Sequence, residues 1–338
     1  MTPKEIDKLV FKGTFPEQTK ARKLIHTHIS WVILCDLFAY KIKKPINYSF
    51  LDFSTLELRK YFCERELELN QRFSKDIYLE VLPIHELQGY FIIGGAKGTL
   101  TDYTLKMRRL DSEKQMDVLI SKNKVSETDI KKLAERIGDF HKTATIISEK
   151  DILGIKEKFN DLGLEKQFLS KNLGSEYSKR IDDAIATSNT FLQKSKKLLQ
   201  ERLQEGFFRD CHGDLHTRNI FLLPEPQPFD CIEFHDDYRY IDVLNEVAFL
   251  CMDLDVLGKK DLSDVCISHY NLQFPTMRTP EEHQLFVYYK SYRANVRAKV
   301  NSLRAKSATK HSDRIKALSE VKKYLRLMDV YLNLLNAK

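Results

Sequence analysis

The chain has 338 residues, of which 42% are hydrophobic and 30% charged, with a formal net charge of +7 at pH 7. This composition is ordinary for a folded globular protein and excludes a wholly disordered chain. The positive charge is mild and is spread along the length, so it requires no nucleic-acid partner. The length favours two lobes around one cleft over a single undivided core.

The six cysteines form no C-x-x-C pair, which favours reduced thiols in a chain of this size. Residues 1–15 carry acids and lysines without a continuous apolar run. No later segment reaches the roughly 18 apolar residues that a membrane-spanning helix needs. We therefore expect a cytoplasmic protein with no membrane partner.

The first strong pattern along the chain is a β-hairpin. Residues 31–35 and 39–43 are rich in strand-forming side chains and flank a short turn at 36–38. Ser54, with Glu57 three residues later, then predicts the N-cap of a helix that runs to about residue 73.

Three further β-rich runs follow this helix, at residues 77–83, 89–94 and 103–108. A glycine-rich turn at 94–98 separates the last two runs. Residues 1–110 are therefore expected to form a small, mostly antiparallel lobe that binds the nucleotide described below.

The remainder of the chain, residues 111–338, is expected to form a larger, mostly helical lobe. Apolar residues recur at spacings of three and four over 127–145, and 175–204 is a long amphipathic stretch. Short strands are predicted at 207–208, 220–223 and 229–234, and Pro224, Pro226 and Pro228 separate the last two. Everything beyond residue 241 reads as helix, with a break at Pro275 and Pro280.

Two motifs in the predicted helical lobe indicate phosphoryl transfer. Residues 211–219 read C-H-G-D-L-H-T-R-N, and residues 232–234 read I-E-F. In kinase chemistry an aspartate accepts the proton of the attacking hydroxyl, while an asparagine five residues later and a second acid hold magnesium. Asp214, Asn219 and Glu233 have this order and spacing. The alternative is an ordinary loop aspartate that caps a turn.

These motifs resemble those of the aminoglycoside phosphotransferase and choline kinase-like superfamily, whose pattern is H-G-D-x-x-x-x-N followed by I-D-F. Residues 26–32, 39–45, 51–56 and 229–234 are similar to the kinase-like half of bacterial bifunctional aminoglycoside phosphotransferase/ATP-binding proteins. A P-loop domain often follows in that group, but this chain has no G-x-x-x-x-G-K-[ST], so we expect a stand-alone form.

The resemblance implies a bilobal protein-kinase-like α+β fold, with a small antiparallel N-lobe and a larger helical C-lobe. It also implies that His212 and Asp242 support the catalytic loop, although Asp242 reads equally as a helix N-cap. Glu233 departs from the usual aspartate, and its longer side chain would change the geometry around a metal.

For the nucleotide, a cation on the sheet lobe must hold the phosphates, and an acid on the adjoining helix must fix it. Lys43 with Glu66 is the preferred pair. Lys41 remains an alternative, because residues two apart share one face of a strand.

The glycine-rich phosphate loop of protein kinases is missing, and Thr27 and Ser30 stand where it would lie. Their hydroxyls and the local backbone amides are expected to contact phosphate. By analogy with kinases, the segment around Met107 is expected to supply backbone contacts to adenine.

On the acceptor side, Arg293 and Arg297 share one face of a predicted helix and can bind a phosphate or carboxylate. A solvated basic helix is the alternative. Aminoglycosides are polycationic and need an acidic site, and no dedicated acid cluster is evident, so antibiotic resistance is not expected.

We therefore expect an ATP- and magnesium-dependent phosphotransferase that acts on a hydroxyl of a small molecule. A protein kinase is the first alternative, disfavoured by the lack of D-F-G and A-P-E motifs. A catalytically weak or inactive nucleotide-binding pseudokinase scaffold is the second, favoured by Glu233 and the missing glycine-rich loop. The sequence leaves the acceptor and the oligomeric state open.

Overall fold

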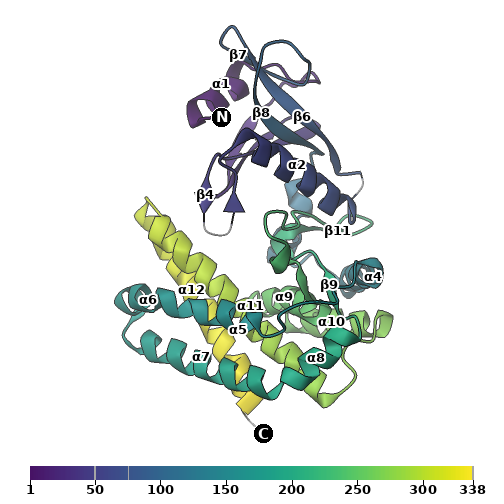
Figure 1. Ribbon diagram of the computed structural model, residues 1–338, viewed down its shortest axis with the longest axis vertical. Helices are drawn as coiled ribbons and strands as arrows, with labels where there is room; N and C mark the ends of the chain where they lie inside the picture. The colour runs from purple at the N-terminus through teal and green to yellow at the C-terminus, as the bar shows by residue number, and fades with distance from the viewer. Residues whose placement is uncertain (49–50, 75, 337–338) are drawn as a thin grey trace. The chain divides into compact units, whose positions relative to one another are not determined.

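The computed structural model describes residues 1–48, 51–74 and 76–336, and the chain divides into two compact units. Unit 1 comprises Met1–Lys122 and Arg218–Tyr238, and unit 2 comprises Asn123–Thr217 and Arg239–Lys338. Unit 1 holds an antiparallel sheet and unit 2 is mostly helical (Figure 1), which confirms the expected α+β class. The expected lobes were residues 1–110 and 111–338, whereas unit 1 extends to Lys122 and also includes Arg218–Tyr238.

The sheet of unit 1 has six antiparallel strands in the order β1-β2-β3-β8-β6-β7. Its strands are β1 Lys23–His26, β2 Ser30–Leu34, β3 Phe38–Lys43, β6 Tyr78–Leu87, β7 Tyr90–Ile93 and β8 Thr99–Arg108. The predicted hairpin is confirmed as β2 and β3, each displaced by one residue or less at its ends. Strand β1 was not predicted, because its four residues are exposed or half-buried and show no apolar alternation.

Side chains alternate between the two faces of β2 and β3, as period-two geometry requires. Trp31 and Ile42 are register partners, and both are buried in a cluster that includes Ile6 and Leu9 of helix α1 (Pro3–Lys12). Helix α1 therefore covers this face. Lys41 lies between Tyr40 and Ile42 on β3, so it points to the other face, where helix α2 lies.

Helix α2 spans Leu56–Gln71 and packs against β6 and β8. Its N-cap is Thr55, whose hydroxyl accepts a hydrogen bond from the Leu58 N–H at 3.2 Å. The prediction of Ser54 as the N-cap was therefore wrong. Ser54 instead belongs to a turn in which its own N–H donates to Asp52 at 2.9 Å.

Unit 1 also contains small elements that sequence patterns describe poorly. These are β4 Asn47–Tyr48 paired with β5 Leu51–Asp52, α3 Met116–Ser121, and β10 Ile220–Phe221 paired with β11 Gln227–Pro228. The strand predicted at 229–234 does not form, because Asp230 has a φ of 63°, which breaks an extended run.

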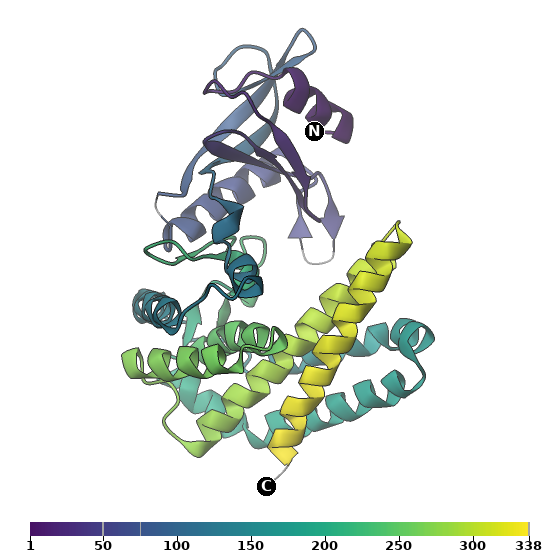
Figure 2. The same cartoon turned by 180° about the vertical axis from the view of Figure 1, so that it is seen from behind.

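Unit 2 consists of helices and one short two-stranded pairing, β9 Phe208–Asp210 with β12 Tyr240–Asp242. Its helices are α4 Glu127–Thr143, α5 Gly154–Asn160, α6 Lys166–Leu173, α7 Glu176–Lys194, α8 Lys196–Gln204, α9 Val243–Val256, α10 Lys260–Gln273, α11 Pro280–Ser307 and α12 His311–Asn336. The long amphipathic stretch at 175–204 forms two helices, α7 and α8, which are divided at Ser195. Figure 2 shows α11 and α12 as two long helices side by side. Within the described ranges, no helix combines the length and the apolar character needed to cross a bilayer.

Candidate active site

The predicted site residues divide between the two units. Lys43, Glu66 and Glu233 belong to unit 1, together with the other nucleotide- and metal-binding candidates, Thr27, Ser30, Met107 and Asn219. Asp214 belongs to unit 2, together with the candidates for support and acceptor binding, His212, Asp242, Arg293 and Arg297. Each group is described within its own unit.

In unit 1, both candidate lysines of β3 bind the same glutamate of α2. The Lys41 Nζ lies 2.7 Å from Glu66 Oε1, and the Lys43 Nζ lies 2.8 Å from Glu66 Oε2. Glu66 is fully buried. Burial alone would raise the pKa of Glu66, but the two ammonium groups outweigh it and lower the pKa to about 2. The structure thus brings Glu66 to both lysines, so the contact with Glu66 does not by itself distinguish Lys41 from Lys43.

Each lysine has a second acidic partner, and both partners lie in the segment after β11. Lys43 also donates to Glu233, and the Lys41 Nζ lies 2.6 Å from Asp230 Oδ1. Burial raises the pKa of Glu233, which the neighbouring Lys43 only partly offsets. The predicted metal ligand Glu233 is therefore held by the predicted phosphate-binding lysine.

The segment that carries Asp230 and Glu233 is fastened to α2 and β6 by buried polar contacts. The Cys231 N–H donates to Asn70 Oδ1 and the Asp230 N–H donates to the Tyr78 hydroxyl, both at 2.9 Å. Asn70 and Tyr78 are buried, so these hydrogen bonds are shielded from water. No local pattern distinguishes Asn70, since its contact depends on a partner 161 residues away.

Thr27 and Ser30 lie in the turn between β1 and β2. The Thr27 hydroxyl accepts from the Ser30 N–H at 2.9 Å, and the Thr27 N–H donates to the Ser30 carbonyl at 3.0 Å. These bonds close the turn. The Ser30 Oγ is buried and has no hydrogen-bond partner within the part of the chain that the structure describes.

Met107 lies near the end of β8, between Ala39 of β3 and Tyr78 of β6. The next two N–H groups, of Arg108 and Arg109, donate to the carbonyls of Ile77 and Leu37 at 2.8 and 2.9 Å. These two donors of the predicted adenine-binding segment are therefore already used within unit 1.

Asn219 ends the short turn Thr217–Asn219, which leads into β10. It is 8% exposed, and its carbonyl accepts from the Phe229 N–H at 3.0 Å. Asn219 and Glu233 offer an amide and a carboxylate oxygen, the donor types that magnesium prefers. Their chemistry therefore fits the ion that the fold class implies.

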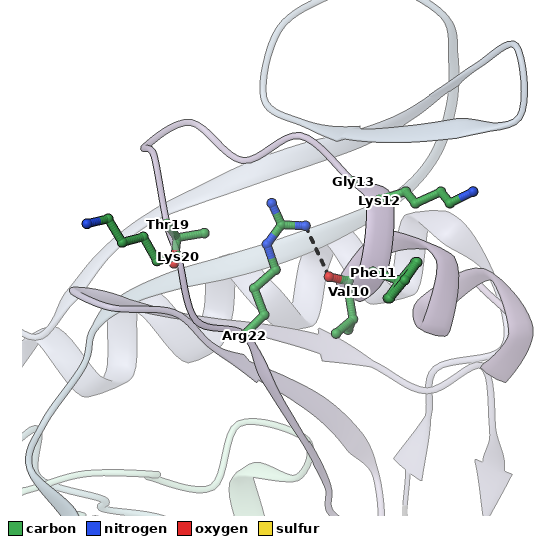
Figure 3. A pocket seen from close by; sticks show the side chains of 7 residues that line it. All are labelled: Val10, Phe11, Lys12, Gly13, Thr19, Lys20 and Arg22. Atoms are coloured by element: carbon green, nitrogen blue, oxygen red, sulfur yellow. Dashed lines mark hydrogen bonds between the residues drawn. The ribbon is translucent and has the colours of Figure 1, made fainter.

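A depression of about 520 Å³ lies elsewhere in unit 1, between the end of α1 and the loop before β1 (Figure 3). Arg22 points into it and donates to the Val10 carbonyl at 3.0 Å, and its guanidinium lies 4.5 Å from the centre of the Phe15 ring. No predicted site residue lines this depression. Its arginine is already engaged, so it carries no functional assignment.

In unit 2, Asp214 is half-buried, with 38% of its side chain exposed, and lies in a loop whose other residues from 212 to 217 are buried. We call residues 212–217 the catalytic loop. The His216 Nε2 lies 3.4 Å from Asp214 Oδ2. Burial would raise the pKa of Asp214, but His216, Arg297 and His212 outweigh it and hold the pKa well below its usual range. Asp214 is therefore ionised and accessible at neutral pH.

Helix α9 holds both ends of the catalytic loop through two buried acids. Glu246 accepts from the N–H groups of His212, at 2.6 Å, and Gly213, at 2.9 Å. Asp253 accepts from the Thr217 N–H at 3.0 Å and from its hydroxyl at 2.6 Å. Between them, the ring of His216 packs edge-on against Phe249.

Sequence reasoning missed Glu246 and Asp253 as supports of this loop. A signal for them exists, since both are acids within a helix that is otherwise almost wholly apolar. They are also seven residues apart, which places them on one face, about two turns from each other. A buried acid needs a partner, and such a pair indicates a backbone segment laid along the helix.

His212 and Asp242 support this region in different ways. His212 is fully buried, and its Nδ1 lies 3.3 Å from the Asp214 N–H, so it contacts the catalytic loop. Asp242 caps α9 by accepting from the Leu244 N–H at 2.9 Å, and it binds Arg202 through both carboxylate oxygens, at 2.6 and 2.8 Å. The acids that accept from the backbone of the catalytic loop are Glu246 and Asp253, whereas Asp242 orders the strand and helix next to it.

Arg293 and Arg297 lie on α11 but differ in their surroundings. Arg293 is 5% exposed, and its guanidinium donates to the Gly213 carbonyl at 3.1 Å and to Asn245 Oδ1 at 2.7 Å. Arg297 is half-buried, and its positive charge helps to lower the pKa of Asp214. Arg293 is therefore tied to the catalytic loop, whereas Arg297 stacks over Tyr324, with its guanidinium 5.6 Å from the ring centre.

The chain is similar in sequence to curated proteins of mycobacteria. No protein-family model matches the chain. Over 284 residues the chain is 31% identical to uncharacterised proteins of Mycobacterium tuberculosis and Mycobacterium bovis, a match that covers 82% of this chain. It covers 54% of each relative, so the chain spans about half the length of the curated relatives it matches.

Solved structures match over nearly the whole chain. Choline kinase from Cryptosporidium parvum has a TM-score of 0.58 at 13% identity, over 93% of this chain and 90% of that one. A choline/ethanolamine kinase family protein from Mesorhizobium loti has a TM-score of 0.51 at 14% identity, over 93% and 94%. An aminoglycoside phosphotransferase from Alicyclobacillus acidocaldarius has a TM-score of 0.51 at 11% identity, over 100% and 96%. The predicted resemblance is thus confirmed at the level of the fold: the chain has the fold of the choline kinase and aminoglycoside phosphotransferase structures.

Proposed function

We propose that the protein is a phosphotransferase that moves the γ-phosphoryl group of ATP to a hydroxyl of a small molecule, with magnesium. The observation that carries the proposal is the cluster in unit 1, where Glu66 of α2 binds both lysines of β3 while Lys43 also binds Glu233. A lysine fixed by a helix glutamate next to a candidate metal ligand is the arrangement that phosphate binding in kinases requires.

The nucleotide side of the reaction uses residues of unit 1. The ammonium groups held by Glu66 are positioned to contact phosphate oxygens, with Thr27 and Ser30 as nearby donors and the segment around Met107 at adenine. Asn219 and Glu233 would hold magnesium, which when bound neutralises phosphate charge.

The acceptor side uses the catalytic loop of unit 2. Asp214 accepts the proton of the attacking hydroxyl, because it is ionised and exposed in a loop that Glu246, Asp253 and Arg293 hold in place. Arg297 is the candidate for contact with the acceptor. Most of the rate enhancement would come from positioning and charge neutralisation, since the protein forms no covalent bond to the phosphoryl group.

The test is the substitution Asp214→Asn, which keeps the shape of the side chain and removes its basicity. Nucleotide affinity, measured by calorimetry, is expected to stay within about twofold. Turnover of ATP with acceptor is expected to fall roughly 100- to 10,000-fold, the usual contribution of a general base. Asp264→Asn, at an exposed helix residue paired with Lys260, is the matched control and should leave both unchanged.

A nucleotide-binding scaffold is the second candidate, because Lys43 binds Glu233 and so occupies a predicted metal ligand. A scaffold would bind ATP without consuming it, and Asp214→Asn would then change no rate. Unchanged ATP consumption in Asp214→Asn would likewise contradict the role of Asp214 as the base.

A further inference from the structure

We propose that Lys41, and not Lys43, is the lysine that contacts the nucleotide phosphates, and that the carboxylate of Asp230 holds its ammonium group until a phosphate replaces it. This inference rests on the proposed binding of a nucleotide. The inference gives Lys41 and Lys43 different functions, although both side chains point to the same face of β3. It also gives Asp230 a function, as the anion that a phosphate replaces.

The surroundings of the two ammonium groups differ. The Lys43 side chain is fully buried, and its Nζ binds Glu66 and Glu233 above the ring of Phe53, 4.8 Å from the ring centre. Both carboxylates are nearly inaccessible, with side-chain exposures of 1% and 4%. Taking Lys43 away from either one would leave a buried charge without a partner, which is costly. Lys43 is therefore a structural tie between β3, α2 and the segment of Glu233.

Lys41 has one buried partner and one exposed partner. Its side chain is 10% exposed; Glu66 is buried, but the side chain of Asp230 is 45% exposed. The carboxylate of Asp230 is half-exposed, so water partly replaces the ammonium group when it moves away, and separating this pair costs less than separating a fully buried pair. Lys41 can therefore exchange Asp230 for another anion and keep its bond to Glu66.

Asp230 is held in place by its backbone and not by its side chain. Its φ of 63° lies in the left-handed region, which is uncommon for residues other than glycine, and its N–H donates to the buried Tyr78 hydroxyl at 2.9 Å. The carboxylate can swing away from Lys41 without any change in this backbone. The carboxyl oxygen now at 2.6 Å from the ammonium would be replaced by a phosphate oxygen, another anionic acceptor.

Two further features support a phosphate position beside Lys41. Burial lowers the pKa of Lys41, but Asp230, Glu66 and Glu233 outweigh it and raise the pKa well above its usual value, so the side chain stays charged. Ser30 is the register partner of Lys43, so its buried Oγ, which has no hydrogen-bond partner among the described residues, lies on the same face of the sheet as both lysines. The Ser30 hydroxyl can therefore donate a hydrogen bond to a phosphate oxygen.

The experiment compares ADP binding without metal, measured by calorimetry, in the wild type, Lys41→Met, Asp230→Asn and Lys43→Met. Lys41→Met is expected to weaken binding about tenfold or more, the worth of one charge-assisted hydrogen bond. Asp230→Asn is expected to tighten binding a few-fold, because the competing carboxylate is gone. Lys43→Met is expected to lower the melting temperature more than Lys41→Met does. Lys60→Met, at an exposed position of α2, is the control and should bind as the wild type does.

The outcomes separate this inference from the proposed function. If the wild type binds no adenine nucleotide with or without magnesium, the proposed function fails. If the wild type binds and Lys41→Met binds equally well, the assignment of Lys41 is overturned. Unchanged or weaker nucleotide binding by Asp230→Asn would overturn the proposed replacement of Asp230 by a phosphate. The Asp230 side chain is half-exposed, so this variant provides a test even if Lys41→Met does not fold.

Discussion

Individual carboxylates carry much of the organisation of this protein, and Glu246 is the clearest case. It is 1% exposed, and its charge is satisfied by the N–H groups of His212 and Gly213. Burial raises the pKa of Glu246, but the nearby His141, followed by His212 and these N–H groups, outweighs it and lowers the pKa. Glu246, an ionised side chain from a different element, is therefore one of the groups that hold the catalytic loop.

Replacing Glu246 by glutamine tests this dependence. Glutamine keeps the size but loses the charge, and it turns one acceptor into a donor that faces the loop. We expect a loss of about 1.5 to 3 kcal/mol in the free energy of unfolding, the usual range for hydrogen bonds to a charged group, measured by urea titration. Glu320→Gln, at a partly exposed residue of α12, is the control and should change stability little. Equal stability of the two variants would show that Glu246 does not hold the loop.

Glu66 gives the unit 1 cluster a defined response to acid. Its pKa is lowered from a usual value of 4.5 to about 2 in the folded state. The resulting stabilisation is fully present above pH 4.5 and is lost as the pH falls toward 2, because the unfolded chain takes up the proton first. A shift of this size corresponds to about 3 kcal/mol.

This response is measurable as the pH dependence of unfolding. Between pH 5 and pH 3, wild-type stability should fall more steeply than that of Glu66→Gln, in which the group cannot titrate. The comparison uses slopes, so the lower overall stability expected for the variant does not affect it. Parallel curves would mean that Glu66 keeps its ordinary pKa, and that the two lysines do not bind it in solution.

At the scale of elements, the sequence predicted best those helices and strands that depend on local residue patterns. The hairpin of β2 and β3 follows from β-rich runs around a short turn, and α2 follows from its helical composition, although its N-cap was expected one residue too early. Helix α1 was not predicted, although Thr2 and Glu5 form a capping box with Pro3 at the first helical position, which is a local signal for a helix start. The strand expected at 229–234 failed because the backbone of Asp230 is fixed by distant Tyr78.

In the candidate site, too, local spacing was predictable from the sequence and long-range contacts were not. The spacing of Asp214, Asn219 and Glu233 is a property of the sequence and could be read from it. The contacts of Glu246 with His212, and of Cys231 with Asn70, join residues 34 and 161 positions apart. No local pattern encodes such pairings, because they depend on how complete helices pack.

The cap of α2 offers a test at this scale, because Glu66 and Asn70 both belong to that helix. Thr55→Ala removes the hydroxyl that accepts from the Leu58 N–H and should cost about 1 kcal/mol of stability. Ser54→Ala, one residue earlier, leaves this bond intact and should cost less than half as much. Thermal melts of the two variants make the comparison, and a larger loss for Ser54→Ala would mean that the helix begins one residue earlier.

At the scale of the whole molecule, the chain passes between its two units three times, after residues 122, 217 and 238. Asp214 lies before the second of these passages and Asn219 after it. The proposed reaction therefore draws on residues of both units, linked by a few residues of chain. Because the chain spans about half the length of the curated relatives it matches, activities that need the rest of those proteins lie outside this proposal.

The most direct test of the proposed phosphotransferase activity is a transfer assay with ATP labelled in the γ-phosphoryl group, against a library of small molecules that carry hydroxyls. We predict that the wild type transfers label to at least one compound in the presence of magnesium. Asp214→Asn should bind ATP with similar affinity and transfer none above background. A wild type that binds ATP yet labels no compound, or an Asp214→Asn protein that transfers label as fast as the wild type, would contradict the account.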